Sequence, residues 1–299
     1  MSSKTKIEWT DMTSNPIHLV KEDGKNGGHW CKKISEGCAN CYAEAQNQSG
    51  FFSFASHLKY AGEAPKNLIL DEAVLQSWVK LKKPHKIFVC SMTDMFGEWV
   101  SKEWILKIFT YFRKCPQHTF QVLTKRPERM HDIISKIWWE DEQALLWGEP
   151  STAKPLPNVW LGTSIENQKA LYSRFNSLRE LRSHGWTTFY SVEPLLEKVN
   201  LDLQNYGVGW VIVGGESGKG ARPCNYEWVL GIVEQCQKTG TPVFVKQLGS
   251  NPGGICTKSA SNIFASHSIK DSKGGDIQEF PLPIQVREFP KTLATTGSK

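Results

Sequence analysis

The sequence lacks the features of a membrane or secreted protein. No run approaches the roughly eighteen apolar residues that a membrane-spanning helix needs, and the first ten residues contain no apolar core of a secretory signal. There is no low-complexity tract, and no internal repeat beyond an alternation of strands and helices. These absences predict a cytoplasmic globular protein, and 299 residues with 39% hydrophobic content can bury the core of one large domain or two small ones.

A strong charge of one sign is also absent. The chain has 36 Lys and Arg against 30 Asp and Glu, a formal net charge of +6. This mild excess tolerates a phosphate-rich partner without requiring one. The twelve tryptophans could stack on nucleic-acid bases, although tryptophan is more often a packing residue.

Most cysteines are scattered singly, but three of the eight lie within eleven residues of the segment 29–44: Cys31, Cys38 and Cys41. In a reducing compartment such clustering indicates a metal site rather than disulfides. Thiolates select iron–sulfur clusters or zinc, and a cluster with only three cysteine ligands leaves one iron open for another ligand. Alternatively, His29 could complete a Cys3His zinc site. We expect Gly37 to permit a sharp bend in the loop.

Short apolar runs predict a parallel sheet. Six of them have the length and the β-branched and aromatic content of buried strands: 86–91, 119–124, 158–163, 187–192, 210–215 and 242–247. Helices are predicted between them, including 71–82, 102–114, 167–183 and 226–238. This alternation indicates an α/β fold with an open doubly wound sheet or a (β/α) barrel. A first strand is expected at 15–20, which would put the cysteine loop directly after it.

The predicted domains are a barrel over residues 1–248, with the cysteine loop 29–44, and a C-terminal extension over residues 249–299. The extension loses the strand–helix pattern and is rich in Gly, Ser and Pro. We expect it to wrap against the barrel.

Sequence motifs occur along nearly the whole chain. They are Lys6-Ile-Glu-Trp-Thr10 with Asn15-Pro16, Cys31-x6-Cys-Ala-Asn-Cys-Tyr-Ala-Glu44, Ser91-Met-Thr-Asp-Met-Phe96, Leu123-Thr-Lys-Arg-Pro127, Gly162-Thr-Ser-Ile-Glu166, Ser191-Val-Glu-Pro194, Gly214-Gly-Glu-Ser-Gly218 with Gly220-Ala-Arg-Pro223, Lys246-Gln247 and Arg287-Glu-Phe-Pro290. A three-cysteine loop at the start of a parallel barrel resembles radical S-adenosylmethionine enzymes. The motifs together resemble a phage-encoded, radical-SAM-like family of poorly defined function.

This resemblance implies a partial TIM-type (β/α) barrel of about six or seven parallel strands. It implies a [4Fe–4S] cluster on the three cysteines, with S-adenosyl-L-methionine on the open iron, and radical chemistry on an unknown substrate, possibly a nucleic acid or nucleotide. A reductant such as a flavodoxin or ferredoxin and a three-Cys-motif partner protein are further implied. One alternative is a zinc-stabilised nucleic-acid-binding protein without radical chemistry, and another is a redox-sensing cluster protein that does not cleave the cofactor.

The remaining candidate residues follow the predicted strands, at the edge where α/β folds build their sites. Expected to bind the cofactor are Tyr42, Ser91, Thr93, Asp94, Lys125, Glu166, Glu193, Gly214, Gly215 and Glu216. Expected to bind substrate are Arg126, Arg222 and Gln247, and Cys224 and Lys246 are candidate catalytic residues. Asp94 could accept a hydrogen bond from the cofactor ammonium or cap a turn. A buried Lys246 requires a ligand or a carboxylate partner. Together these residues predict a positively charged mouth that receives an anionic ligand.

Overall fold

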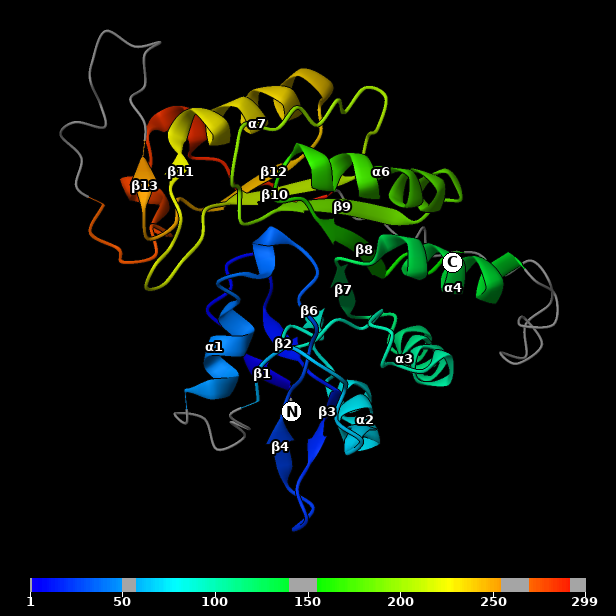
Figure 1. Cartoon of the computed structure of the whole chain (residues 1–299). Coiled ribbons are helices and arrows are strands. Elements are labelled where there is room, and N and C mark those ends of the chain that lie inside the picture. Colours follow the sequence, from blue (N-terminus) through cyan, green and yellow to red (C-terminus); the bar gives the residue numbers. More distant parts are fainter. Residues whose placement is uncertain (1, 50–57, 140–154, 254–268, 291–299) are drawn as a thin grey trace, which may run out of the picture.

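The main element of the fold is a curled, eight-stranded sheet (Figure 1). The computed structural model describes residues 2–49, 58–139, 155–253 and 269–290. In spatial order the strands are β1 (Ser2–Lys4), β2 (Met12–Ser14), β6 (Lys86–Val89), β7 (Thr119–Thr124), β8 (Val159–Ser164), β9 (Thr187–Val192), β10 (Trp210–Gly214) and β12 (Val243–Gln247). Strand β1 pairs antiparallel with β2, and every other pairing in this sheet is parallel. The predicted partial barrel of six or seven parallel strands is therefore confirmed.

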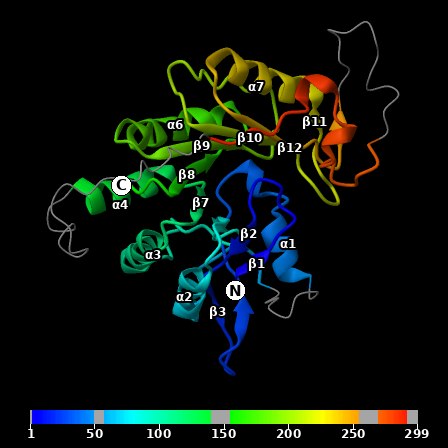
Figure 2. The ribbon, with the colours of Figure 1, turned by 180° about the vertical axis from the view of Figure 1, so that it is seen from behind.

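Helices cover the outer face of the sheet, as the strand–helix alternation predicts (Figures 1 and 2). They are α2 (Glu72–Lys80), α3 (Lys102–Lys114), α4 (Pro127–Trp139), α6 (Gln168–Ser183) and α7 (Tyr226–Thr239). Polar side chains begin several of them: Asp71, Ser101, Asn167 and Asn225 each accept hydrogen bonds from backbone N–H groups of the first helical turn. A helix begins at its cap, which explains why the predicted bounds differ from these by only one or two residues.

The prediction of the first strand is wrong. The first parallel strand is β2, whereas the apolar run Ile17–Val20 forms β3 of a separate antiparallel sheet. In that sheet β3 pairs with β4 (Asn26–Gly28) and β5 (Leu68–Leu70), and the β3–β4 hairpin projects from the body of the molecule (Figure 1). The cysteine loop thus follows an inserted hairpin and not the first barrel strand.

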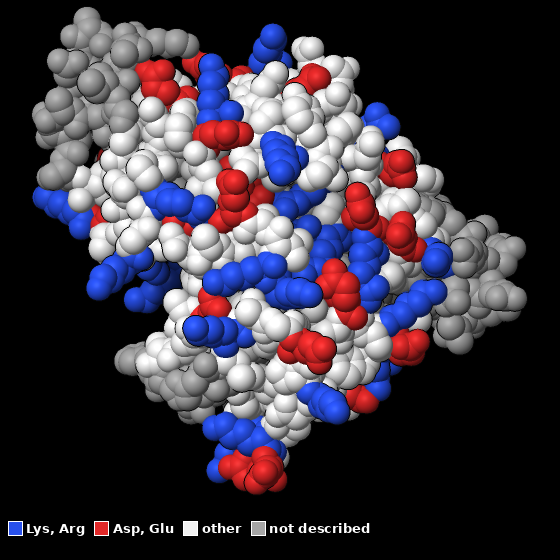
Figure 3. Space-filling view, viewed as in Figure 1, with Lys and Arg blue, Asp and Glu red and all other residues white. Residues whose placement is uncertain are grey.

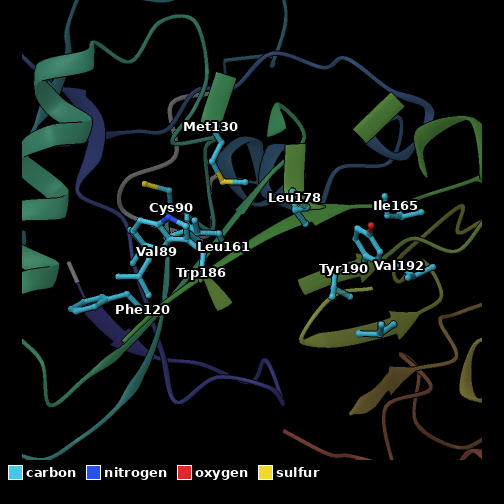
Figure 4. Packing of buried hydrophobic residues seen from close by; sticks show 14 of the residues in the cluster. Val89, Cys90, Phe120, Met130, Leu161, Ile165, Leu178, Trp186, Tyr190 and Val192 are labelled. Carbon is cyan, nitrogen blue, oxygen red and sulfur yellow. The ribbon is translucent and has the colours of Figure 1, made fainter. Parts of the chain in front are cut away.

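Residues on the two faces of each strand belong to different cores. Outward side chains such as Val89, Leu161 and Val192 pack with the helices in a large outer core, part of which Figure 4 shows. Inward side chains form a second, mostly aromatic core: Trp9, Phe88, Trp160, Phe189, Trp210, Ile212 and Phe244. This aromatic layer fills the interior at the N-terminal ends of the strands. The polar motif residues follow the same strands, so they lie at the opposite end.

The last described segment, 269–290, packs against the sheet. The Arg287 guanidinium donates hydrogen bonds to the carbonyl oxygens of Val245, Lys246 and Gly275, and Phe289 contacts the Trp210 ring of the inner core. Two short strands, β11 (Cys224–Asn225) and β13 (Pro252–Gly253), and two 3-10 turns, Ile277–Glu279 and Leu282–Ile284, belong to this C-terminal part of the fold. The boundary at 248/249 stays a prediction. Among the described helices, none is long and apolar enough to cross a membrane.

Candidate metal and cofactor site at the C-terminal edge of the sheet

The cysteine loop lies across the C-terminal ends of the parallel strands. It contains a 3-10 turn, Glu36–Cys38, and leads into helix α1 (Tyr42–Gln48), which lies on the inner side of the curled sheet (Figure 1). Because seven strands run parallel, their carboxyl ends meet at this edge. The structure therefore brings the predicted motif residues of separate strands to the loop.

The segment after β6 binds both ends of the loop. The Thr93 hydroxyl donates to the Trp30 carbonyl oxygen over 2.6 Å, and the Tyr42 hydroxyl donates to the Ser91 carbonyl oxygen over 2.7 Å. Asn15, which follows β2, accepts a hydrogen bond from the Met92 backbone N–H and so fixes this segment in turn. Two predicted cofactor-binding side chains, those of Thr93 and Tyr42, thus hold the loop itself.

Glu166, after β8, is fully buried and anchors the middle of the loop. Its carboxylate accepts a 2.6 Å hydrogen bond from the Ser35 hydroxyl and pairs with Lys125 and, at 2.7 Å, with Arg174. Burial alone would raise the pKa of Glu166, but the charges of Lys125 and Arg174 outweigh it and hold that pKa below its usual value. This carboxylate is a structural anchor in the conformation described.

Gly37 owes its place to Glu166. A Cβ atom added at Gly37 would lie 2.3 Å from Cγ of Glu166, far closer than real side chains approach. Gly37 is not among the described residues with positive φ. The loop does bend here, in the 3-10 turn Glu36–Cys38, but without a positive φ. Glycine is needed because the loop backbone lies directly against a buried carboxylate.

Glu216, after β10, anchors the second half of the loop together with Arg222. Its carboxylate accepts a 2.8 Å hydrogen bond from the Asn40 side-chain amide and forms an ion pair with Arg222 at 2.6 Å. Arg222 also donates to the Glu36 carbonyl oxygen of the loop. Burial alone would raise the pKa of Glu216, but the hydrogen bonds from Arg222 and Asn40 outweigh it and hold that pKa below its usual value.

Asp94 and Arg126 form another contact between strand ends and loop. The Asp94 carboxylate accepts from the Phe96 N–H, the Thr124 hydroxyl, the Lys125 N–H and the Arg126 guanidinium. These four donors satisfy it, and the predicted turn cap is the hydrogen bond to Phe96. Arg126 additionally pairs with Glu98, stacks on the Trp99 ring and donates to the Lys32 carbonyl oxygen.

The three cysteines are free thiols. Burial raises the pKa of the Cys31 thiol, and Asp94, Cys41 and Cys38 raise it further, while Arg126 opposes them. Burial likewise raises the pKa of Cys41. The thiols are thus near enough to influence one another, and burial holds Cys31 and Cys41 as neutral S–H groups. Among the residues described, no three Cys, His, Asp or Glu side chains are gathered tightly enough to form a ready metal site.

His29 belongs to the packing of the inserted hairpin. Its Nδ1 atom lies 3.1 Å from the Ile17 carbonyl oxygen, and its ring contacts the ring of His18 edge-on. Burial lowers the pKa of His29 to about 4, so the imidazole is neutral. These contacts give no support to the zinc alternative, which stays untested.

One ion pair at the strand ends is partly exposed and does not bind the cysteine loop. Lys246 of β12 pairs with Glu193, after β9, at 3.0 Å, and the Ser191 hydroxyl donates to the other carboxylate oxygen. The side chains retain 21% and 14% exposure. The predicted carboxylate partner of Lys246 is therefore Glu193, and none of the described hydrogen bonds of this pair involves the cysteine loop.

The remaining candidates face the protein interior. The Gln247 amide donates to the Gly215 carbonyl oxygen, and Gly215 lies against Leu248 and Cys224. Cys224 packs in the outer core, and burial raises its thiol pKa to about 12. This placement gives no support to a hydrogen-donor role for Cys224. The Gly214 backbone lies beside Glu193, where a Cβ atom would be 2.9 Å from Oε1.

A strongly positive mouth is not what the described residues form. Each predicted cation is paired with a carboxylate: Lys125 with Glu166, Arg126 with Asp94 and Glu98, Arg222 with Glu216 and Lys246 with Glu193. On the face shown in Figure 3, positive and negative side chains are interspersed. Three of these pairs reach the cysteine loop, so their described role is to fix it.

Sequence reasoning missed several loop contacts. Ser35, Glu98 and Arg174 gave no distinct signal, because a serine in a loop and charges near helices are common everywhere. Asn40 and Glu44 lie inside the recognised cysteine motif, and that position was the available signal. Glu44 accepts from the Tyr60 N–H over 2.7 Å and pairs with Lys33.

Comparison with known proteins places the chain in a family. The family model for a protein of unknown function, DUF5131, matches residues 4–274. The chain belongs to this family. None of the curated proteins matches it. Among solved structures, a spore photoproduct lyase mutant with bound AdoMet and dinucleoside spore photoproduct is similar at TM-score 0.40 and 10% identity. A second mutant of that lyase is similar at TM-score 0.37 and 9% identity. Each match covers 80% of this DUF5131 chain and 53% of the lyase, so the chain spans about half the length of these enzymes.

Proposed function

We propose that this protein is a radical S-adenosylmethionine enzyme in which Cys31, Cys38 and Cys41 hold a [4Fe–4S] cluster. The observation that carries the proposal is a loop with three free thiols, held over the C-terminal edge of a curled parallel sheet by side chains from several strand ends. Three soft thiolates suit an iron–sulfur cluster and leave one iron without a protein ligand. The donor set therefore fits the group.

Loading such a cluster requires the thiols to lose their protons, which metal ligation drives. The contacts that hold the loop favour cluster loading. Contacts to the loop at Trp30, Ser35 and Asn40 limit how far the cysteine backbone can move, so less ordering is needed when the sulfurs converge. When bound, the cluster supplies one electron and an open iron for cleavage of S-adenosylmethionine.

The residues of the chain would then bind and orient the cofactor and the substrate and keep water out of the site. The Lys246–Glu193 pair is partly exposed and makes no described hydrogen bond to the cysteine loop, so it offers a cation and an acceptor to a ligand, while the buried Ser191 hydroxyl orients the Glu193 carboxylate. The proposed substrate is a nucleic acid or nucleotide, with which the +6 net charge is compatible. The cofactor-binding roles of Ser91, Gly214 and Gly215 stay predictions.

Metal analysis of anaerobically purified protein tests the proposal. We expect about four irons and matching sulfide per chain, lost in Cys31→Ser, Cys38→Ser and Cys41→Ser. Cys236→Ser is the matched control, because Cys236 lies in the outer core and not in the loop. One zinc per chain, dependent on His29 as well as the three cysteines, would instead establish the zinc alternative.

Cofactor cleavage is the second measurement. A fully loaded protein with a competent reductant should release 5′-deoxyadenosine slowly even without substrate. A loaded protein that releases no more than a cluster-free control would contradict the radical chemistry while leaving the cluster intact.

A further inference from the structure

The inner face of the sheet changes character from one end to the other. Near the N-terminal ends of the strands, the inward positions of β9, β10 and β12 carry Phe189, Trp210 and Phe244 of the aromatic core. Two residues further along β9 and β12, the inward positions carry Ser191 and Lys246, because side chains alternate between the faces of a strand. Helix α1 lies on this same inner side (Figure 1). Packed aromatic rings thus give way to polar groups toward the C-terminal edge.

The ion pair between Glu193 and Lys246 lies at this polar level, and solvent still reaches it. The two side chains keep 14% and 21% exposure. One carboxylate oxygen of Glu193 lies 3.0 Å from the Lys246 ammonium, and the other accepts from the Ser191 hydroxyl. With these contacts each oxygen keeps a lone pair and the ammonium keeps donors for a ligand. Because the pair is neutral as a whole, it suits an uncharged polar group better than a phosphate.

The ring of Tyr42 adjoins this pair. Its hydroxyl donates to the carbonyl oxygen of Ser91, which follows β6, so the side chain extends from α1 toward the strand ends. Burial of the hydroxyl end raises the pKa of Tyr42, and Cys41 and Glu193 raise it further, which places Glu193 near the phenol. The residue as a whole is nevertheless 45% exposed. An accessible aromatic ring therefore lies beside a pair with free donors and acceptors.

We propose that Tyr42, Glu193 and Lys246 bind a guanine base, which stacks on the tyrosine ring and turns its hydrogen-bonding edge to the ion pair. This inference rests on the proposed function, because it names the base that a nucleic-acid or nucleotide substrate presents to the site. Stacking on an aromatic side chain suits every base. The ion pair therefore decides which base is bound.

Guanine is the base whose edge matches the pair. Its N1–H and N2 amino groups donate side by side to the two oxygens of one carboxylate, and its neighbouring O6 accepts from an ammonium. Adenine and cytosine present one amino donor beside a ring acceptor, and uracil and thymine present one N–H between two carbonyl oxygens. Each of these bases would leave one oxygen of Glu193 without a donor, which costs affinity. The adenine of S-adenosylmethionine is thus a poorer match than guanine.

Nucleotide binding to the purified chain tests the proposal and does not require the cluster. We expect guanosine monophosphate to bind, and inosine monophosphate, which lacks the N2 amino group, to bind about tenfold more weakly. Adenosine monophosphate should bind no better than inosine monophosphate. Glu193→Gln should reduce the preference for guanosine over adenosine monophosphate about tenfold, because an amide offers a donor where the carboxylate offers a second acceptor. The matched control is Glu22→Gln, in the turn between β3 and β4.

The contribution of the ring is tested separately. Tyr42→Leu should weaken the binding of both nucleotides about tenfold, whereas Tyr42→Phe, which keeps the ring, should stay within about threefold of the unmodified chain. This second variant also shows whether loss of the hydroxyl contact to Ser91 disturbs the site. The matched control is Tyr172→Leu, because Tyr172 is 63% exposed on α6, on the outer side of the sheet.

A single-stranded oligonucleotide with one guanine separates the two sources of the base. Binding of the mononucleotide indicates a free nucleotide and binding of the oligonucleotide alone indicates a nucleic acid, and either result supports the proposal if adenine in place of guanine weakens it. Equal binding of guanine and adenine, or no binding of either probe, would overturn it. Displacement of guanosine monophosphate by S-adenosylmethionine would also overturn it, because the ring would then serve the cofactor.

These results are independent of the proposed radical chemistry. A chain that loads the cluster and releases 5′-deoxyadenosine but shows no guanine preference would refute this inference alone. A chain that prefers guanine, and loses the preference in Glu193→Gln, but loads no iron would contradict the proposed function and leave the base site standing.

Discussion

Replacement of Gly37 by alanine is the most direct test of how the cysteine loop is held. The added Cβ would lie 2.3 Å from Cγ and 2.7 Å from Oε1 of Glu166. Glu166 cannot swing away without cost, because it is fully buried and its carboxylate holds Ser35, Lys125 and Arg174. Either the carboxylate or the loop has to give way.

The energies decide which one moves. Displacing Glu166 from its cations would cost about 3–5 kcal/mol, the usual penalty for breaking a buried pair. Lifting the loop loses mainly the charge-assisted hydrogen bond from Ser35, about 1.5–3 kcal/mol. The loop should therefore lift locally, and we expect Gly37→Ala to destabilise the docked loop by roughly 1–3 kcal/mol, the range found for overpacked cores.

Hydrogen exchange and urea unfolding measure this effect. The Cys38 amide, which donates to the Ser35 carbonyl oxygen, should exchange faster, by roughly tenfold for each 1.4 kcal/mol. Gly231→Ala is the matched control: Gly231 lies inside α7 with nothing within 4 Å of an added Cβ, so the same change should stabilise the protein by about 0.5–1 kcal/mol. If Gly37→Ala leaves both urea stability and loop exchange at the unmodified values, the loop is not held against Glu166 and the anchoring argument fails.

Three further predictions concern the frame around the site. Gly162→Ala should destabilise the inner core by about 1–3 kcal/mol in urea unfolding, because its Cβ would meet the Phe189 ring at 2.3 Å; an unchanged midpoint would show that the ring can repack freely. Arg287→Ala should lower stability by about 2 kcal/mol or more and speed proteolysis of the segment 269–290, because three backbone carbonyls lose their donor. Burial raises the pKa of Asp71, but hydrogen bonds from His18 and from the first turn of α2 outweigh it and lower that pKa. Its stabilising effect is therefore present above the unfolded pKa and lost as pH falls through the folded pKa, so the urea-stability deficit of Asp71→Asn, about 1 kcal/mol at neutral pH, should shrink below about pH 4; a deficit independent of pH would contradict this.

The sequence predicts the sheet well where strands are buried on both faces. The six apolar runs became β6, β7, β8, β9, β10 and β12 because their residues enter either the outer or the inner core. The first barrel strand was missed because β2 is only Met-Thr-Ser, with a single apolar residue. Its extended form depends on pairing with β1 and β6, which no local pattern encodes.

Local sequence pattern indicates which residues follow the strands but not which partners they contact. Glu166, Glu193 and Glu216 lie at the expected edge, since strand ends can be read from local pattern. Their partners cannot, because Ser35 and Glu166 are 131 residues apart and Asn40 and Glu216 are 176 apart. A carboxylate that closes one loop and one that awaits a ligand have the same local sequence, and only the fold distinguishes them.

That distinction explains why so many charges surround one loop. A buried ion pair contributes little net stability, because desolvation offsets most of the attraction. It does impose geometry, since a paired carboxylate that also accepts a hydrogen bond from Ser35 or Asn40 tolerates few loop positions. Apolar contacts could stabilise the loop equally well, but they are not directional and would allow it several positions. The three thiols would then be close together in a smaller fraction of the molecules. The Lys246–Glu193 pair makes no described hydrogen bond to the loop, so it does not fix the position of the loop. For that reason Lys246→Ala should leave the iron content and the hydrogen exchange of the loop unchanged while altering ligand binding at this edge of the sheet. Arg222→Ala removes a donor to the Glu36 carbonyl oxygen and should lower the iron content.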